Sequence, residues 1–420
     1  MRSRRRTIVA LLVVALAGLA AALAGSVRAS TKVATTVVIW TDSYRVAAFQ
    51  QIGAAYASAH PGVQFQVVQK TFGVSGAGSI GGDLSTTAAQ DAPDIISAAH
   101  DWTGQLQANG LVVPIHLSNA VRAGFPAYTL NAFSYGTAVK NLYAVPTQIE
   151  NVGLVVNTKQ VAVPKTWAQL ESQAMAWKKK HHTKVGIAVP DGAPNGDAYH
   201  MYPFFSGLGG FVFGFNHAGN LDPSNIGVAS KALIKNSGMI DAWNKEGLIS
   251  SSVDYGTAKT LFETGKVPFW ITGPWETSSL QQSGIKFKIV QMPKIVYPAV
   301  PFLGVQGVMV TKYASQHGVS AIVSDFVQNY LTKAGPQYQL ANAEGRYPAL
   351  VAAGKQVHSS VLAQFGAAGK GGVPMPNIPQ MNSVWQYLGQ AWVNSTKGSG
   401  ATQASKAFKN ASRQIAQAIG

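Results

Sequence analysis

The sequence predicts an α/β protein of two domains, and three observations lead to this expectation. Residues Thr35–Trp40 form a short β-rich run, residues 45–60 place apolar side chains on one helical face, and Val63–Gln69 alternate as in a strand. A strand, a helix and a strand in this order predict a parallel sheet covered by helices. The length of 420 residues exceeds what one hydrophobic core usually supports, which favours two domains.

Later segments continue the alternation of strands and helices. Ala92–Ala98 is apolar and predicts a buried strand that runs into a loop. Thr166 and Gln169 have the spacing of a capping box, so we expect a helix to begin after Thr166. Pro374–Pro379 contains three prolines and predicts stiff, extended backbone, after which helical spacing begins at Met381. The chain shows neither a fixed-period repeat nor a long flexible linker.

Residues 1–29 predict a secretory signal. A basic segment is followed by an uncharged apolar run, Thr7 to Ala24, and by small residues that place cleavage after Ala29. The alternative is an uncleaved membrane anchor, because an apolar run of this length can just span a bilayer. The chain has no cysteine, which excludes disulfides, thiolate metal sites and lipidation after the leader. We therefore expect an exported protein, in the periplasm or at the outer face of the cytoplasmic membrane.

The basic composition does not by itself indicate a nucleic-acid partner. The formal net charge is +16, but several of the arginines lie in the leader and most lysines are isolated. The cluster Lys178–Lys184 follows a predicted helix, where cations complement the helix dipole. No aromatic residues alternate with the basic ones, so we expect no nucleic-acid binding.

Two short motifs resemble cofactor and metal sites but lack the context these need. Gly76–Gly81 matches GxGxxG, yet a polar glycine-rich loop separates it from the preceding strand. Asp191–Asp197 has the character of a calcium loop without the later bidentate glutamate. We therefore expect no cofactor and no metal. The common hydrolase and nucleotide signatures are also missing.

Isolated carboxylates beside aromatic residues are the remaining candidates for a functional site. Aromatic rings stack on the C–H faces of a sugar, and carboxylates accept hydrogen bonds from its hydroxyls. This chemistry predicts a carbohydrate site. A glycoside hydrolase that uses Asp101 and Glu150 stays an alternative, since hydrolysis also needs two carboxyl groups. The candidates are Asp101, Trp102, Glu150, Asp197, Tyr199, Trp275 and Trp385.

The sequence resembles the extracellular sugar-binding proteins of ABC importers, in particular the maltose and maltodextrin binders. The resemblance covers almost all of the exported chain, and its most specific motifs are GPW, ending at Trp275, and MPNIPQM followed by Trp385. It implies a type II periplasmic-binding-protein fold, in which two α/β lobes close over a ligand in the cleft between them. It also implies a membrane permease as partner, a monomer and no catalytic chemistry. A sugar sensor that serves a receptor is a further possibility.

The resemblance implies a discontinuous division into lobes. The first lobe is expected to comprise residues 33–149 and 303–347, and the second residues 150–302 and 348–420. The chain would cross between them near Glu150, Phe302 and Tyr347.

The same resemblance assigns roles to individual residues. Asp101 and Glu150 match carboxylates that accept sugar hydroxyls, Asp197 and Tyr199 match an acidic and aromatic pair, and Trp275 and Trp385 match the stacking tryptophans. Tyr44 and Arg45 stand where the family offers a polar pair. The chain departs from the pattern at Ala98, Trp102, Gln386 and Gly389. The stacking tryptophans remain, so the resemblance still implies a di- or oligosaccharide of the maltose or maltodextrin type, with trehalose or another glucoside as the alternative. Trp102 and Gln386 join the expected ligand-binding residues.

Overall fold

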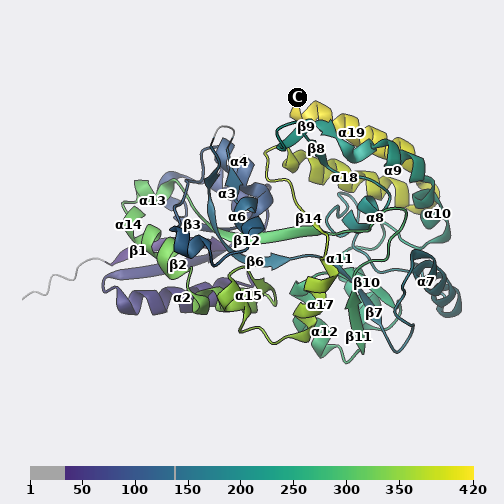
Figure 1. Cartoon of the computed structure of the whole chain (residues 1–420), viewed down its shortest axis with the longest axis horizontal. Helices are drawn as coiled ribbons and strands as arrows, with labels where there is room; N and C mark the ends of the chain where they lie inside the picture. The colour runs from purple at the N-terminus through teal and green to yellow at the C-terminus, as the bar shows by residue number, and fades with distance from the viewer. Residues whose placement is uncertain (1–33, 137–138) are drawn as a thin grey trace, which may run out of the picture.

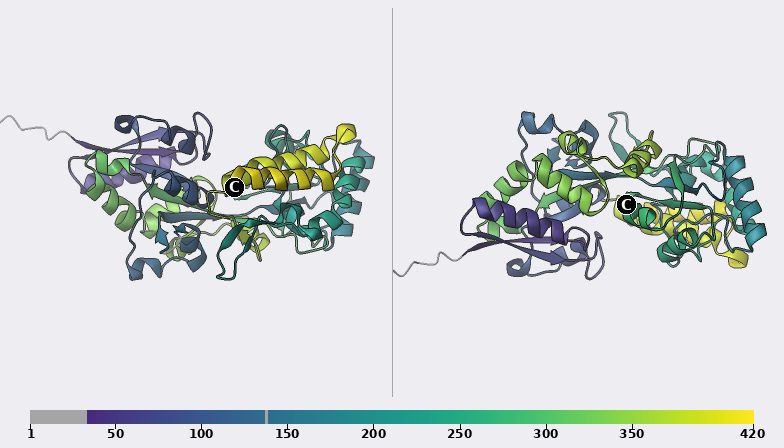
Figure 2. Two further views of the ribbon diagram at one scale, coloured as in Figure 1. Left: turned by 90° about the horizontal axis from the view of Figure 1, so that it is seen from above. Right: turned by 90° about the horizontal axis from the view of Figure 1, so that it is seen from below.

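The computed structural model describes residues 34–136 and 139–420, which form two lobes arranged along the long axis of the molecule (Figure 1). Figure 2 shows the same two lobes from above and from below. The predicted leader and its cleavage site after Ala29 lie outside the described residues. None of the helices in these two ranges combines the length and the hydropathy that a membrane span requires.

The first lobe is built around the predicted strand, helix and strand unit. β1 (Thr35–Thr41) pairs in parallel with β2 (Val63–Gln69) on one side and with β3 (Ile95–Ala99) on the other. α2 (Val46–Ala59) connects β1 to β2 and packs against β2. The predicted parallel unit is therefore confirmed, with strand ends shifted by no more than a few residues.

Two strands run from one lobe towards the other (Figure 1). β12 (Phe302–Val310) is antiparallel to both β3 and β6 (Ala144–Glu150), so the complete sheet is mixed rather than parallel. At its start β12 belongs to the second lobe, where the rings of Phe302 and Tyr202 stack with centroids 3.5 Å apart. At its end it lies between β3 and β6 in the first lobe.

Helices cover this sheet, with α2 and α15 on one side and α3, α4 and α6 on the other (Figure 1). The further helices of the first lobe are α3 (Ile80–Leu84), α4 (Thr103–Ala108), α5 (Asn119–Arg122), α6 (Ala127–Ala132), α13 (Tyr313–Gln316), α14 (Ser320–Asp325), α15 (Ala334–Ala343) and α16 (Val351–Gly354). Short strands complete the lobe: β4 (Ser134–Tyr135), β5 (Asn141–Leu142) and β13 (Tyr347–Pro348).

The second lobe has an antiparallel sheet of three strands, β10 (Phe269–Thr272), β7 (Gly153–Asn157) and β11 (Phe287–Val290). Its other strands are β8 (Phe213–Phe215), β9 (Leu221–Ile226) and β14 (Val373–Pro374). Its helices are α7 (Trp167–His181), α8 (Tyr202–Gly207), α9 (Lys231–Asn236), α10 (Gly238–Glu246), α11 (Tyr255–Glu263), α12 (Thr277–Gln282), α17 (Ser360–Ala368), α18 (Met381–Thr396) and α19 (Ala404–Ile419).

The predicted capping box starts α7. The Thr166 hydroxyl accepts a hydrogen bond from the Gln169 N–H at 3.2 Å, and Gln169 Oε1 accepts from the Lys165 N–H at 2.9 Å. The side chains therefore satisfy N–H groups at the helix start that have no partner within the helix.

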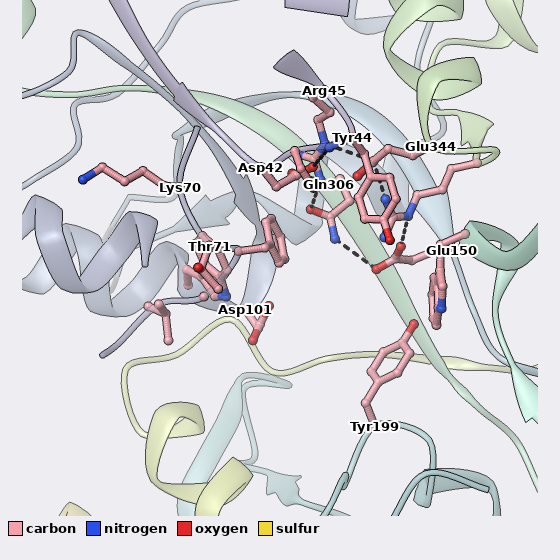
Figure 3. Close-up of a pocket in the computed structure, with 18 of the residues that line it drawn as sticks. Asp42, Tyr44, Arg45, Lys70, Thr71, Asp101, Glu150, Tyr199, Gln306 and Glu344 are labelled. Atoms are coloured by element: carbon pink, nitrogen blue, oxygen red, sulfur yellow. Dashed lines mark hydrogen bonds and ion pairs between the residues drawn. The ribbon is translucent and has the colours of Figure 1, made fainter. Parts of the chain in front are cut away.

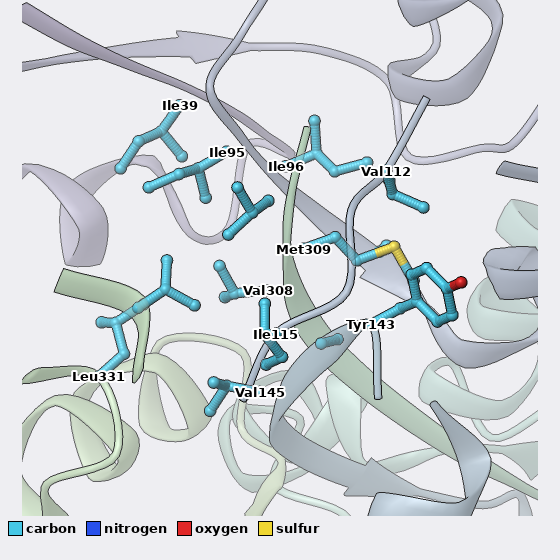
Figure 4. Packing of buried hydrophobic residues seen from close by; sticks show 14 of the residues in the cluster. Ile39, Ile95, Ile96, Val112, Ile115, Tyr143, Val145, Val308, Met309 and Leu331 are labelled. Atoms are coloured by element: carbon cyan, nitrogen blue, oxygen red, sulfur yellow. The ribbon is translucent and has the colours of Figure 1, made fainter. Parts of the chain in front are cut away.

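Buried apolar side chains form separate clusters in the two lobes. The first-lobe cluster, part of which is drawn in Figure 4, takes its residues from 37–145 and 305–353. The second-lobe clusters take theirs from 152–302 and 361–415. The predicted lobe boundaries stay a prediction, but Leu350 and Ala353 belong to the first-lobe cluster although they follow the expected crossing at Tyr347. They do so because α16 packs against α15 and β13.

Candidate functional site

A cavity of about 680 Å³ lies beside β6 and β12 and is lined by residues of both lobes. Its size falls within the range of small-molecule sites, roughly 300–1,000 Å³. Figure 3 shows the labelled side chains around it, with Lys70, Thr71 and Asp101 on one side and Glu150 and Tyr199 on the other.

Eight of the ten predicted ligand-binding residues line this cavity. They are Tyr44, Arg45, Asp101, Trp102, Glu150, Tyr199, Trp275 and Trp385. Their position is thus established, and their role in ligand binding stays a prediction.

Asp197 and Gln386 are not among the lining residues. Asp197 Oδ1 accepts hydrogen bonds from the N–H groups of Tyr199 and His200, and Oδ2 lies 2.7 Å from His200 Nδ1. Burial alone would raise the pKa of Asp197, but His200 and these N–H donors hold it below its ordinary value. The carboxylate therefore stabilises the turn that carries Tyr199. Gln386 is exposed, because one step along α18 from Trp385 it turns away from the cavity.

Arg45 is buried and is held by three acceptors. Its Nη2 lies 3.2 Å from Asp42 Oδ2 and donates to Gln306 Oε1 at 3.3 Å, and its Nε lies 3.0 Å from Glu344 Oε2 (Figure 3). A buried cation is stable only when it is paired in this way. Arg45 is therefore fixed at the cavity wall, with its charge already neutralised by first-lobe groups.

Arg346 extends the same network towards the second lobe. It forms ion pairs with Glu150 and Glu344, and its Cζ lies 5.4 Å from the ring centroid of Trp275. The second oxygen of Glu150 accepts a hydrogen bond from Gln306 Nε2 at 3.0 Å. Although burial would raise the pKa of Glu344, Arg346 and Arg45 lower it to about 2. Burial would likewise lower the pKa of Arg346, but the carboxylates of Glu150 and Glu344 raise it.

Asp101 and Trp385 meet across the cavity. The short helical turn His100–Trp102 carries Asp101, and Trp385 on α18 donates from Nε1 to Asp101 Oδ2 at 3.0 Å. Asp101 is 8% exposed, and burial, opposed by this hydrogen bond, raises its pKa to about 7. The ionised carboxylate thus accepts too few hydrogen bonds to offset its burial. A ligand that donates hydrogen bonds to it would stabilise its charge.

The proline-rich segment before α18 is attached to the first lobe. The carbonyl oxygen of Met375 lies 3.0 Å from His100 Nε2, and that of Asn377 accepts from the Gly104 N–H at 3.0 Å. Asn377 Nδ2 also donates to the carbonyl oxygen of Ala132 at 2.9 Å. The extended run therefore bridges the lobes next to Asp101 and determines where α18, and with it Trp385, begins.

The second-lobe wall is aromatic and is fixed by a chain of polar contacts. Trp275 donates from Nε1 to the Tyr255 hydroxyl at 2.6 Å, and this hydroxyl donates to Glu276 Oε1 at 2.5 Å. Lys259 Nζ lies 2.8 Å from the other oxygen of Glu276. The Tyr199 and Trp275 rings lie 6.1 Å apart. The Trp275 indole is therefore held at its nitrogen by Tyr255, and the Arg346 guanidinium lies over its ring.

Sequence reasoning missed several lining residues: Asp42, Lys70, Phe72, Tyr255, Gln306, Glu344 and Arg346. Asp42 is a direct neighbour of the predicted Tyr44 and Arg45 segment, and Arg346 adjoins the expected crossing at Tyr347, so proximity to those segments was the available signal. Phe72 lies in the polar glycine-rich loop before Gly76, where the sequence pattern gives no indication of a ligand site. The described residues also contain no group of three His, Cys, Asp or Glu side chains placed to hold a metal ion.

Two α/β lobes, joined by crossing strands and enclosing a polar and aromatic cavity, define a two-lobe ligand-binding protein. The profile of the bacterial extracellular solute-binding protein family matches residues 41–338, which is more than half of the chain. The chain belongs to this family. The family resemblance and the type II fold expected from the sequence are thereby confirmed.

Several characterised relatives are similar over most of the chain. The galactooligosaccharide-binding protein of Bacillus subtilis is 24% identical, over 86% of this chain and 84% of its own length. The maltotriose-binding protein of Pyrococcus abyssi is 26% identical, over 83% of this chain and 75% of its own. The structure of a Thermus thermophilus maltotriose binding protein with bound maltotriose superposes with a TM-score of 0.76 at 25% identity, covering 91% of this chain and 100% of that one.

Proposed function

We propose that this protein binds an oligosaccharide of the maltodextrin type outside the cytoplasm and delivers it to an ABC importer. The observation that carries the proposal is the cavity itself, where Asp101 of the first lobe meets Trp385, Tyr199 and Trp275 of the second. The names of several relatives support it, including a maltooligosaccharide ABC transporter solute-binding lipoprotein of Streptococcus pneumoniae that is 26% identical over 70% of this chain.

The chemistry of the cavity suits a sugar. Half-buried aromatic rings offer flat faces for the C–H groups of pyranose rings, and Asp101 offers a carboxylate for sugar hydroxyls. Because these groups belong to different lobes, a sugar that contacts both sets stabilises the closed arrangement over an open one. Closure would then present the loaded protein to a permease.

The proposal is tested with the mature protein and a panel of maltotriose, a galactooligosaccharide of equal length, trehalose and glucose. A sugar that binds only the native state raises the melting temperature, and calorimetry then gives its affinity. We expect the largest shift with maltotriose. The absence of any shift across the panel would refute a sugar-binding role.

We further propose that the protein is not an enzyme. A glycosidase needs one carboxylic acid and one free carboxylate at the scissile bond. The raised pKa of Asp101 would suit an acid, but both oxygens of Glu150 are engaged by Gln306 and Arg346, which makes Glu150 a poor nucleophile or base. Incubation with maltooligosaccharides should produce no new reducing ends, and steady turnover would favour the hydrolase instead.

We also propose an exported monomer without nucleic-acid binding, in keeping with a family of extracellular proteins. Mass spectrometry of the protein from its native membrane and soluble fractions would show whether cleavage occurs after Ala29 or the leader is retained as an anchor. Light scattering would measure the oligomeric state with and without sugar. Co-purification of a permease with the sugar-loaded protein would distinguish delivery to an importer from signalling to a receptor.

A further inference from the structure

The glycine-rich loop between β2 and α3 forms part of the first-lobe wall of the cavity. Its residues Thr71, Phe72, Gly73 and Val74 all line the cavity. The GxGxxG motif Gly76–Gly81 runs from this loop into the first turn of α3, and no part of the proposed sugar binding uses it. The contacts within the loop show what its glycines achieve.

The loop is folded tightly on itself. The Thr71 N–H donates to the Gly78 carbonyl at 3.0 Å and the Gly81 N–H to the Gly73 carbonyl at 2.9 Å. A Cβ atom at Gly81 would overlap the backbone of Val74, and one at Gly82 would overlap the backbone of a neighbouring glycine. Only glycine permits this close approach. The motif therefore fixes the segment 71–74 against the start of α3.

Phe72 lies on this segment, lines the cavity and contacts two first-lobe side chains. The Phe72 ring lies 4.6 Å from the ring of Trp102, between centroids, and the Arg45 guanidinium carbon lies 5.2 Å from the Phe72 centroid. Trp102 is 5% exposed, whereas Phe72 is 36% exposed. Trp102 thus serves mainly as a backing for Phe72. Phe72 presents an accessible aromatic surface of the first lobe, as does Tyr44, which also lines the cavity.

We propose that Phe72 is a ligand-contacting and specificity-determining residue, a first-lobe counterpart of the second-lobe aromatic wall. The inference rests on the proposed sugar binding and deepens it. With Phe72 on one lobe and Tyr199, Trp275 and Trp385 on the other, closure places aromatic rings on both faces of a bound sugar ring.

We call this arrangement of aromatic rings on both faces of a sugar ring an aromatic clamp. It selects the sugar by its stereochemistry. In a glucose unit the hydroxyls at carbons 2, 3 and 4 are equatorial, so both faces of the ring expose C–H groups there. A galactose unit has an axial hydroxyl at carbon 4, which interrupts one face and would lose its hydration against a ring. The clamp therefore favours chains of glucose units over chains of galactose units.

The test compares the wild type with Phe72→Ala, Phe72→Leu and Phe72→Trp. Affinity for maltotriose and for a galactose trisaccharide is measured by calorimetry on each full chain. Phe211→Ala is the matched control, because Phe211 is 38% exposed and lies outside the cavity. Circular dichroism and the melting temperature, both measured without sugar, show whether each variant is folded. Because the substituted side chains are exposed, we expect only small changes in these two measurements.

We expect Phe72→Ala and Phe72→Leu to lose about tenfold in affinity for maltotriose, while Phe72→Trp and Phe211→Ala bind as the wild type does. The preference for maltotriose over the galactose trisaccharide should fall in the Ala and Leu variants. Wild-type affinity and selectivity in Phe72→Ala would overturn this inference and leave the proposed function intact. A wild type that binds no sugar would overturn both.

Discussion

The buried carboxyl of Asp101 gives a quantitative prediction about pH. Its pKa is raised from 3.8 to about 7, chiefly by burial, so the folded protein holds a proton that the unfolded chain releases at lower pH. At 1.36 kcal/mol for each pH unit, the folded state incurs a cost of about 4 kcal/mol when Asp101 ionises. The cost is absent below about pH 4, grows between about pH 4 and 7, and is complete above pH 7.

Asp101→Asn removes the ionisation while keeping an oxygen that accepts from Trp385. The wild type should therefore lose stability relative to this variant as the pH rises. The difference in free energy of unfolding, variant minus wild type, should increase by up to about 4 kcal/mol between pH 4 and pH 7. Urea denaturation of both proteins across this range measures the difference, and the subtraction cancels groups that titrate in both. A difference that does not change with pH would show that Asp101 ionises normally and refute the reasoning.

The same carboxyl should couple sugar binding to pH. Sugar hydroxyls that donate to the ionised form lower the pKa of Asp101, so binding releases a proton and wild-type affinity rises with pH, at most tenfold per unit below about pH 7. Asp101→Asn should bind sugar more weakly with no such slope. Calorimetry in buffers of different ionisation enthalpy measures the released proton, and equal heats in all buffers would contradict the coupling.

Three further changes test the walls of the cavity and the loop. Trp385→Ala should weaken sugar binding at least tenfold with the fold intact, because a stacking surface is lost; calorimetry showing unchanged affinity would remove Trp385 from the site. Tyr255→Phe should free the Trp275 indole and reduce affinity about threefold to tenfold by calorimetry, and unaltered binding would mean that the hydrogen bond does not position the ring. Gly81→Ala should lower the free energy of unfolding, measured by urea denaturation, by about 1–3 kcal/mol. Gly238→Ala, at an uncrowded helix start, should not lower it. Equal effects of the two substitutions would refute the account of the loop.

Local patterns were sufficient for the elements that depend on neighbouring residues. The strand, helix and strand unit, the capping box at Thr166 and the helix after Pro379 follow from periodicity, capping and proline chemistry, and all three are present in the structure. The antiparallel course of β12 was not predictable in this way, because its partners β3 and β6 are more than 150 residues away in the chain.

The sequence by itself determined the α/β class, the family and the types of side chain available to a ligand, since these depend on local spacing and on motifs. Tertiary structure decided which of those side chains reach the cavity and in what state. It joined Asp197 by hydrogen bonds to Tyr199 and His200, paired Arg45 and Arg346 with carboxylates, and packed Phe72 against Trp102. The reason is physical: burial, ion pairing and ring contacts are set by residues far apart in the chain, so the raised pKa of Asp101 exists only after both lobes have enclosed it.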